Sequence, residues 1–375
     1  MLALAATAFA LNLNTNVLGA LLPFVRAELG IDGDGGALLV AAAGFGSAAG
    51  ALLVGPLSAR WGRRRALEAG LVVFVASSAG HVVAASFWPF LALRTLSGLA
   101  VGLAYAAASA CAADLAPYAR RGAVMGRFNA GLFLAIPVGL PLTVLLAVAG
   151  HWTWIFAVQA LVGLGAGLAT RRFVPGDGTA GPAAGLSPLR NAGVVPGLVA
   201  TMLHVGSFFT VVQLATAWLD DTGLVAKERQ MWVWVGLGAL SVAGSAGFAR
   251  LSDRVGKRLF VLATSAVLVG CFLLLARGPS PGVLLVVACV LALAAAARTG
   301  PLQALLSGLV PAGRLGALLG LRGFRVQRGV GTFALGAGAL PAELGFEGVL
   351  VLAAGCQFLS YLAIRLGVHE PADKP

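Results

Sequence analysis

The sequence alternates between long apolar stretches and short polar turns. An α-helix rises about 1.5 Å per residue, so about 20 apolar residues are enough to cross the hydrocarbon core of a bilayer. Twelve stretches reach this length, and we predict a membrane-spanning helix from each. They cover residues 2–25, 37–57, 66–87, 89–113, 121–149, 151–170, 194–217, 230–249, 259–277, 282–309, 315–340 and 347–367. The pattern predicts an all-α polytopic membrane protein.

The composition supports this prediction. The chain of 375 residues is 59% hydrophobic and 11% charged, with a mean hydropathy of +0.93. A soluble protein of this length needs a more polar surface than this composition supplies. The net charge of +12 comes from basic residues scattered through short turns, so we expect no nucleic-acid partner. The four cysteines fall within apolar stretches, and we expect no metal site and no cofactor.

The basic residues also predict how the chain is oriented. If both termini are cytoplasmic, the inner turns hold most of the arginines, as the positive-inside rule requires. We therefore expect a multi-pass protein of the plasma membrane, a bacterial inner membrane, with both termini in the cytoplasm. A Gly-, Pro- and Ala-rich linker at 171–193 separates the expected six-helix bundles 1–170 and 194–375.

A repeat relates the two halves of the chain. The segment GPLSARWGRRR at 55–65 returns as ARLSDRVGKR at 249–258. An offset of 194 residues aligns Gly62 with Gly256, and the same offset aligns Pro117 with Pro311. Internal repeats of this kind are typical of transporters, so we predict two pseudo-symmetric six-helix bundles.

The repeated turn resembles the signature loop between the second and third helices of the major facilitator superfamily. The resemblance implies the fold of that superfamily and a gating role for the matching loop residues, which are Gly55, Arg60, Gly62 and Arg63 in the first copy and Asp253, Arg254 and Gly256 in the second. Ala59 stands where the family has an aspartate that latches the inner gate, which implies a weaker latch in the first half. The alternative is that these basic residues only anchor the topology.

Two further segments carry the resemblance. RTLSGLAVG, starting at Arg94, is similar to the fourth-helix motif of the superfamily, and Gly98 and Gly102 predict close helix packing. GRFNAGLFLAIPVGLP at 126–141 resembles the fifth-helix motif of the drug and sugar efflux branches, with Ala135 in place of a glycine. We expect Pro137, Gly139 and Pro141 to bend this helix.

Polar side chains within the predicted spans are the candidates for substrate binding. Asn12 and Asn16 share one helix face and either line a cavity or bond to a neighbouring helix, while Asn14 points away from them. In the second half, His204 and Gln213 are the polar residues of the seventh span. His204 could bind substrate, exchange a proton or serve only as structure.

Arginines are the most informative candidates. Arg322, Arg325 and Arg328 are expected about 12 to 21 Å into the bilayer, and Arg94 and Arg298 also fall within spans. No aspartate or glutamate lies in the interior of a predicted span, which favours an anionic partner. Alternatively, the eleventh helix starts later and its arginines reach the membrane surface.

These observations predict a secondary transporter that moves a small anionic or polar metabolite by alternating access. The alternative is a proton-coupled multidrug or sugar efflux antiporter, and a remote one is a membrane sensor that transports nothing. An enzyme is not expected, because the spans lack clustered acids, bases or metal ligands. The expected partners are the solute and the lipid bilayer, with protons an open question, and the superfamily usually works as a monomer.

Overall fold

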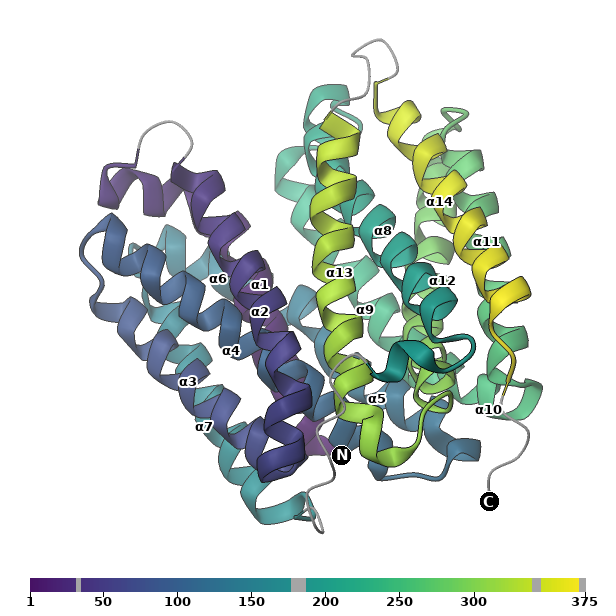
Figure 1. Ribbon diagram of the computed structural model, residues 1–375. Coiled ribbons are helices and arrows are strands. Elements are labelled where there is room, and N and C mark those ends of the chain that lie inside the picture. Colours follow the sequence, from purple (N-terminus) through teal and green to yellow (C-terminus); the bar gives the residue numbers. More distant parts are fainter. Residues whose placement is uncertain (32–34, 177–186, 339–344, 371–375) are drawn as a thin grey trace. The chain divides into compact units, whose positions relative to one another are not determined.

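The computed structural model describes residues 1–31, 35–176, 187–338 and 345–370, and every regular element in these ranges is helical (Figure 1). The first half contains α1 (Leu2–Leu29), α2 (Gly35–Trp61), α3 (Arg63–Val83), α4 (Phe87–Asp114), α5 (Arg121–Leu134), α6 (Leu140–Val148) and α7 (Trp154–Phe173). The second half contains α8 (Val194–Thr222), α9 (Lys227–Gly247), α10 (Ser252–Val255), α11 (Lys257–Leu275), α12 (Pro281–Ser307), α13 (Leu315–Gly338) and α14 (Gly345–Gly367). Because α5 continues through the turn η2 (Ala135–Gly139) into α6, and α10 is short, twelve long helical segments result. Each predicted span is one of them, with boundaries within five residues.

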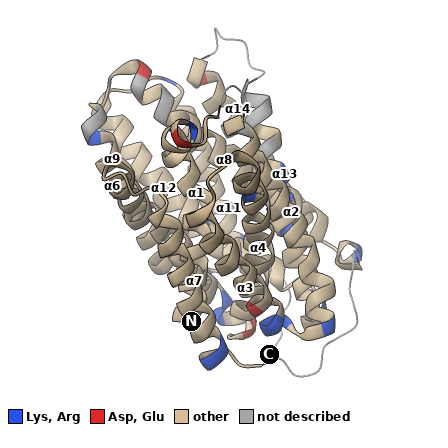
Figure 2. Cartoon of the chain, turned by 90° about the vertical axis from the view of Figure 1, so that its left-hand side faces the viewer, with Lys and Arg blue, Asp and Glu red and all other residues tan. Residues whose placement is uncertain are grey.

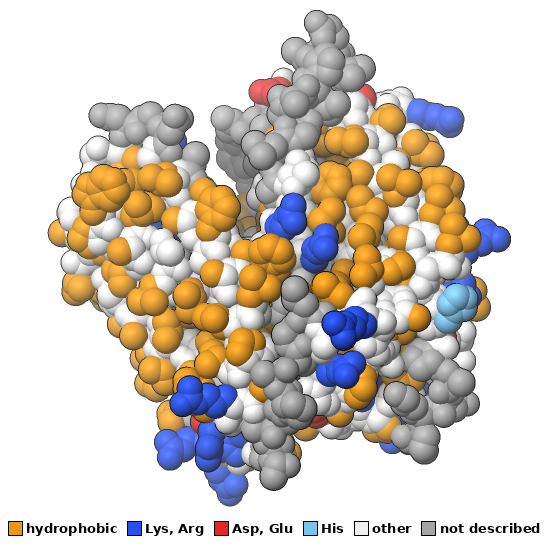
Figure 3. Space-filling model, viewed as in Figure 1, with side chains coloured by type: hydrophobic (Ala, Val, Ile, Leu, Met, Phe, Trp, Pro, Cys, Tyr) orange, Lys and Arg blue, Asp and Glu red, His pale blue; other side chains and the backbone are white. Residues whose placement is uncertain are grey.

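The lengths and composition of these segments fit a bilayer. Eleven of them, within the described ranges, are long and apolar enough to cross a membrane. The remaining one, α13, has 24 residues and contains Arg322, Arg325 and Arg328. Elsewhere the charged residues gather mainly toward helix ends (Figure 2), and hydrophobic side chains cover much of the helix surface (Figure 3). The chain is a multi-pass membrane protein.

The chain divides into two compact units. Unit 1 consists of Met1–Leu115, Gly131–Pro188 and Pro311–Phe324. Unit 2 consists of Ala116–Ala130, Leu189–Val310 and Arg325–Pro375. Unit 1 therefore includes the first part of α13, a helix from the second half of the sequence. Unit 2 includes the first part of α5, a helix from the first half. The middle of the expected linker, 177–186, lies outside the described residues.

Glycines bring α2 and α4 into backbone contact in unit 1. A Cβ atom added to Gly50 would lie 2.0 Å from the Leu99 carbonyl oxygen, and one added to Gly102 would lie 2.0 Å from that of Ser47. A Cβ on Gly98 would come within 2.2 Å of the Ala43 oxygen. Real Cβ atoms do not approach this closely, so only glycine permits the crossing. The close packing predicted for Gly98 and Gly102 is confirmed.

Unit 2 is built around a core of apolar residues from α8, α11, α12 and α14, including Val211, Leu268, Phe272, Leu291 and Leu350. The first part of α5 packs against this unit through glycines. A Cβ atom added to Gly126 would lie 2.3 Å from the Ser245 oxygen of α9, and one added to Gly300 of α12 would lie 2.7 Å from the Gly126 nitrogen.

The repeat seen in the sequence is also a repeat of backbone geometry. Gly62 and Gly256 precede α3 and α11 with φ of 85° and 92°, a region that favours glycine. The Arg64 guanidinium donates to the Arg171 carbonyl at 2.6 Å, and Arg258, 194 residues later, donates to Arg365 at 2.6 Å. Each bond ties the start of the third helix of a half to the end of its sixth.

Candidate functional site

A buried polar cluster joins α1, α4 and α7 in unit 1. Arg94 is 2% exposed, and its Nη1 lies 3.4 Å from Asn14 Oδ1 and 3.5 Å from Asn14 O. Asn14 Nδ2 donates to Gln159 Oε1 at 2.8 Å. Arg94 Nε and Gln159 Nε2 have no hydrogen-bond partner among the described residues. Arg94 is thus held by amide groups, and it keeps capacity to bind a further acceptor.

His81 of α3 is a second buried polar residue of unit 1. Its ring stacks on Phe156 and meets Phe90 edge-on. Its Nδ1 lies 2.6 Å from Ser77 O, which can only accept, so Nδ1 carries the proton. Nε2 is buried and has no partner in the described part of the chain.

The two asparagines predicted to share a face bond to backbone. Asn12 Nδ2 donates to Leu132 O at 2.8 Å, and Asn16 Nδ2 donates to Asn12 O at 2.8 Å. The bond of Asn12 is the helix–helix contact that was the alternative to a cavity position. No recorded hydrogen bond among the described residues uses the amide oxygen of either side chain.

A polar cluster in unit 2 joins α8 to α14. His204 is buried, with Nδ1 3.1 Å from Gln357 Oε1, while Gln357 Nε2 donates to Ser207 Oγ at 3.0 Å. In both units, a polar pair therefore links the first helix of the half to its sixth. Gln213, also on α8, is exposed, and no recorded contact joins it to this cluster.

A second buried arginine lies in unit 2. Arg298 of α12 is 0% exposed and donates to Ser265 of α11 and Ser360 of α14. It comes from the fourth helix of its half, as Arg94 does.

The helix that carries the three arginines of the eleventh span starts where the sequence predicted. The helix begins at Leu315, so Arg322, Arg325 and Arg328 are about 10 to 20 Å along its axis from the start. This removes the alternative of a later start. Arg322 is 5% exposed and hydrogen-bonds Tyr105, Arg325 is half-buried and Arg328 is exposed. No recorded ion pair in the described residues includes Arg322 or Arg325.

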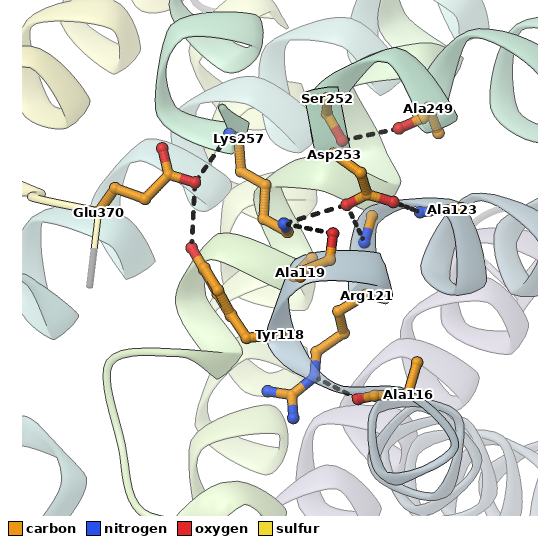
Figure 4. Close-up of polar contacts among 12 residues, drawn as sticks. Ala116, Tyr118, Ala119, Arg121, Ala123, Ala249, Ser252, Asp253, Lys257 and Glu370 are labelled. Atoms are coloured by element: carbon orange, nitrogen blue, oxygen red, sulfur yellow. Dashed lines mark hydrogen bonds and ion pairs between the residues drawn. The ribbon is translucent and has the colours of Figure 1, made fainter. Parts of the chain in front are cut away.

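The second copy of the loop motif forms a network in unit 2 (Figure 4). Asp253 accepts hydrogen bonds from the Gly122 and Ala123 nitrogens at 3.0 and 2.8 Å, which caps the start of α5. It also pairs with Lys257 Nζ at 3.0 Å, while the Lys257 ammonium lies 4.4 Å from the Tyr118 ring centre.

Glu370 completes this network from the chain after α14. It accepts from the Lys257 backbone nitrogen at 2.9 Å and from the Tyr118 hydroxyl at 3.4 Å (Figure 4). It also accepts from the Arg258 backbone nitrogen at 3.2 Å. Arg254 is exposed and outside these contacts.

The first copy of the loop is arranged differently, because the side chain of Ala59 cannot accept hydrogen bonds. Ser58 Oγ is buried without a recorded partner, and a Cβ atom on Gly316 would lie 3.2 Å from it. Arg63 instead pairs with Asp114 and donates to Ala312 O. Gly55 is buried, and a Cβ atom added to it would lie 3.2 Å from the Ala317 Cβ. Arg60 is exposed.

The expected irregularity of the fifth span is a π-helical turn at Ala135–Gly139, between α5 and α6. Pro137 lies within the turn and Pro141 follows it, and both lack the N–H that an α-helix needs. A Cβ atom on Gly139 would lie 2.4 Å from Leu13 Cδ1, so the turn packs closely on α1.

Several residues of these clusters are not among the predicted site residues. Asn14 faces away from Asn12 and Asn16, and the structure shows that it bonds to Gln159 of α7. Gln159, Gln357 and His81 are isolated polar residues in apolar helices, a signal too weak to use by itself. Glu370 was not identifiable, because its partners are more than one hundred residues away.

A family model described as Major Facilitator Superfamily matches residues 4–249, more than half of the chain. The chain belongs to the Major Facilitator Superfamily. The curated relatives of this superfamily member include the uncharacterized MFS-type transporter YwfA of Bacillus subtilis, 34% identical over 42% of the chain and 38% of the relative. The D-xylose transporter of Levilactobacillus brevis is 30% identical over 31% of the chain and 25% of the relative. The galactose-proton symporter of Escherichia coli K12 is 30% identical over 39% of the chain and 32% of the relative. These matches span less than half of each relative.

Solved structures of the superfamily share the fold. The proton:xylose symporter XylE matches with a TM-score of 0.81 at 17% identity, over 96% of this chain and 93% of XylE. The human organic anion transporter MFSD10 matches with a TM-score of 0.75 at 19% identity, over 96% and 98%. The predicted fold class is confirmed.

Proposed function

We propose that this MFS transporter moves a small anionic metabolite across the membrane by alternating access, and that α13 supplies its binding groups. The observation that carries the proposal is the set of arginines 10 to 20 Å along α13, with no acidic ion-pair partner recorded in the described residues for Arg322 or Arg325. Arg325 is half-buried, so its guanidinium is within reach of a solute.

Electrostatics favours an anion as the solute. A guanidinium inside the membrane is costly unless it meets water, carbonyl groups or a negative charge. Its planar fork binds carboxylate or phosphate through two parallel hydrogen bonds. The half-buried Arg325 and the exposed Arg328 can therefore bind the solute directly, and the buried Arg322 adds positive charge to the same helix.

A neutral sugar is the second candidate. It is supported by the relatives that are named as a D-xylose transporter and a galactose-proton symporter. The amide groups of Asn12, Asn14, Asn16 and Gln159 suit sugar hydroxyls. Under this alternative, coupling to protons would rest on a histidine such as His204, because the spans hold no interior carboxylate.

The direction of transport and the setting of the protein are also proposals. The motif at 126–141 favours export, as in the drug and sugar efflux branches. The arginine distribution favours cytoplasmic termini in a bacterial inner membrane, and we propose that the monomer is the working form. The paired loops, with Gly62 and Arg63 in one and Asp253 and Gly256 in the other, are proposed to gate the inner side.

Counterflow into proteoliposomes tests the solute class. We expect saturable uptake of one or more labelled carboxylate or phosphate metabolites that exceeds uptake by protein-free liposomes, and no uptake of cationic dyes. Each solute is measured with and without a pH gradient. Saturable flux confined to neutral sugars would favour the second candidate, and dye flux driven by the pH gradient would overturn the anion proposal.

A further inference from the structure

The two halves of the repeat differ at two surface positions near helix ends. Arg65 at the start of α3 aligns with Leu259 of α11, and Arg172 at the end of α7 aligns with Leu366 of α14, both at the offset of 194 residues. The two leucines are 60% and 73% exposed, and both arginines are exposed. An exposed leucine on a membrane-spanning helix meets lipid tails, which are as apolar as leucine itself. The matching arginines therefore lie at the lipid-facing surface of unit 1.

Each of these arginines ends an exposed apolar face. On α7, Arg172 shares a helix face with Leu161 and Leu168, and both leucines are exposed. On α3, Arg65 shares a face with the exposed Val72. From Leu161 to Arg172 the helix rises about 16 Å, about half of the ~30 Å hydrocarbon core of a bilayer. An acyl chain of one leaflet can thus lie along α7 while its headgroup reaches the arginine.

The two helix ends are fixed to each other. Arg64 donates from Nη2 to the Arg171 carbonyl at 2.6 Å and from Nη1 to the Val174 carbonyl at 3.1 Å. These bonds hold the next residues, Arg65 and Arg172, at the same end of unit 1. Figure 3 shows a group of basic side chains at one end of this unit, beside its hydrophobic surface.

The exposed arginines of this end keep their charge available. Glu68, one turn into α3, pairs with Arg64 at 3.0 Å. No ion pair recorded within the described ranges includes Arg65, Arg171 or Arg172. Three exposed positive charges therefore stand beside an apolar surface without an acidic partner from the described chain.

We propose that Arg65, Arg171 and Arg172 bind the headgroup phosphate of an anionic phospholipid whose acyl chain lies along the exposed face of α7. A guanidinium binds phosphate through parallel hydrogen bonds, and basic clusters next to a membrane span attract anionic lipids. An acidic protein or a free phosphate would match the charge but leave the apolar face unused. The second half, with leucine at two of the three positions, lacks this site. The lipid is distinct from the solute proposed for α13.

Native mass spectrometry of the protein in a neutral detergent tests this site, because it counts the lipids that stay bound. The wild type should bind one phosphatidylglycerol about tenfold more tightly than phosphatidylcholine. The double variant Arg65→Leu, Arg172→Leu copies the second half. Its affinity for phosphatidylglycerol should fall by about tenfold or more, because each arginine near an anionic surface contributes a factor of about five.

Two further variants separate the site from general effects of charge and folding. Arg250→Leu with Arg277→Leu removes two exposed arginines of unit 2 and should leave lipid binding unchanged. Arg65→Lys with Arg172→Lys keeps the charge and should retain part of the binding. The melting temperature of each variant in lipid-free detergent should equal that of the wild type, because the replaced side chains are exposed.

Three results would overturn the proposal. The first is equal affinity of the wild type for the two lipids, and the second is undiminished binding of phosphatidylglycerol by the double leucine variant. The third is displacement of the lipid by inorganic phosphate, which would make a soluble anion the ligand. None of these results would affect the proposed transport function.

Discussion

Lys257, Arg94 and Arg298 are all buried, yet each has a different set of partners. Lys257 has a carboxylate, a carbonyl and an aromatic ring. Arg94 has the amide of Asn14, and Arg298 has two hydroxyls. Since a buried ion pair is most sensitive to the loss of one partner, these residues should respond very differently to substitution.

Asp253→Asn should destabilise the protein strongly. The substitution leaves Lys257 buried without its carboxylate and weakens the cap on α5, which we expect to lower the free energy of unfolding by about 3 kcal/mol. Denaturant unfolding in detergent measures this change. Asp221→Asn, at an exposed position near the end of α8, is the control and should change little. Equal effects of the two substitutions would contradict the role given to Asp253.

Gly62→Ala and Gly256→Ala should each destabilise the protein by about 1 to 3 kcal/mol. Both positions have φ near 90°, which side chains rarely adopt. In α11, a Cβ on Gly270 meets nothing within 4 Å. Gly270→Ala is therefore the control, and it should be neutral or slightly stabilising. If melting temperatures fall equally for all three variants, the backbone geometry is not the cause.

The asparagines of α1 show what can be predicted for single residues. Helical spacing separated Asn14 from Asn12 and Asn16 correctly. It could not show which asparagine joins the buried cluster, because the partner of Asn14 is Gln159, 145 residues away. The same limit applies to Arg94, whose burial follows from the packing of α1 on α4. The role of each predicted site residue as a substrate ligand remains a prediction.

At the level of elements, the helices were the most predictable part of the molecule. Apolar length placed each span, and the start of α13 at Leu315 agrees with the prediction. The ends of α1, α2, α3 and α8 differ from the prediction by four or five residues, because apolar length does not report where the hydrogen bonding of a helix ends. Pro137 and Gly139 predicted an irregular fifth span, but the π-helical form of the turn depends on packing against α1.

The crossing of α2 and α4 should be intolerant of any added side chain. Gly50→Ala would place a methyl group about 2.0 Å from the Leu99 oxygen, so the helices must separate. We expect a loss of about 2 kcal/mol or more and a lower yield of folded protein. A Cβ atom added to Gly165 of α7 would meet no atom within 4 Å, so Gly165→Ala is the matched control. A thermal shift assay on both variants measures the difference, and an unchanged melting temperature for Gly50→Ala would contradict the close approach.

For the whole molecule, the 194-residue repeat predicted two related halves. It aligned Gly62 with Gly256, and the structure shows that both have a positive φ, of 85° and 92°. The two matching arginine–carbonyl bonds, both of 2.6 Å, are seen only in the structure. The repeat did not predict that residues 116–130 join unit 2 and residues 311–324 join unit 1. That exchange depends on contacts such as Gly126 with Ser245, which no local pattern reports.

The repeat also shows where the two halves have diverged. The second loop places Asp253 on the start of α5, while Ala59 leaves the first loop without this acceptor, and Arg63 pairs with Asp114 instead. The sequence predicted a weaker latch from Ala59, but the alternative pairing of Arg63 needed the structure.

The charge on α13 is the central element of the proposed function, and the flux of an anion through Arg325 variants tests it most directly. With an anion that the wild type transports, counterflow should fall at least tenfold in Arg325→Gln, which corresponds to about 1.4 kcal/mol of lost binding. Arg325→Lys should recover part of the flux because it keeps the charge. Arg277→Gln, at an exposed turn after α11, should transport normally. Undiminished flux in Arg325→Gln would contradict the account.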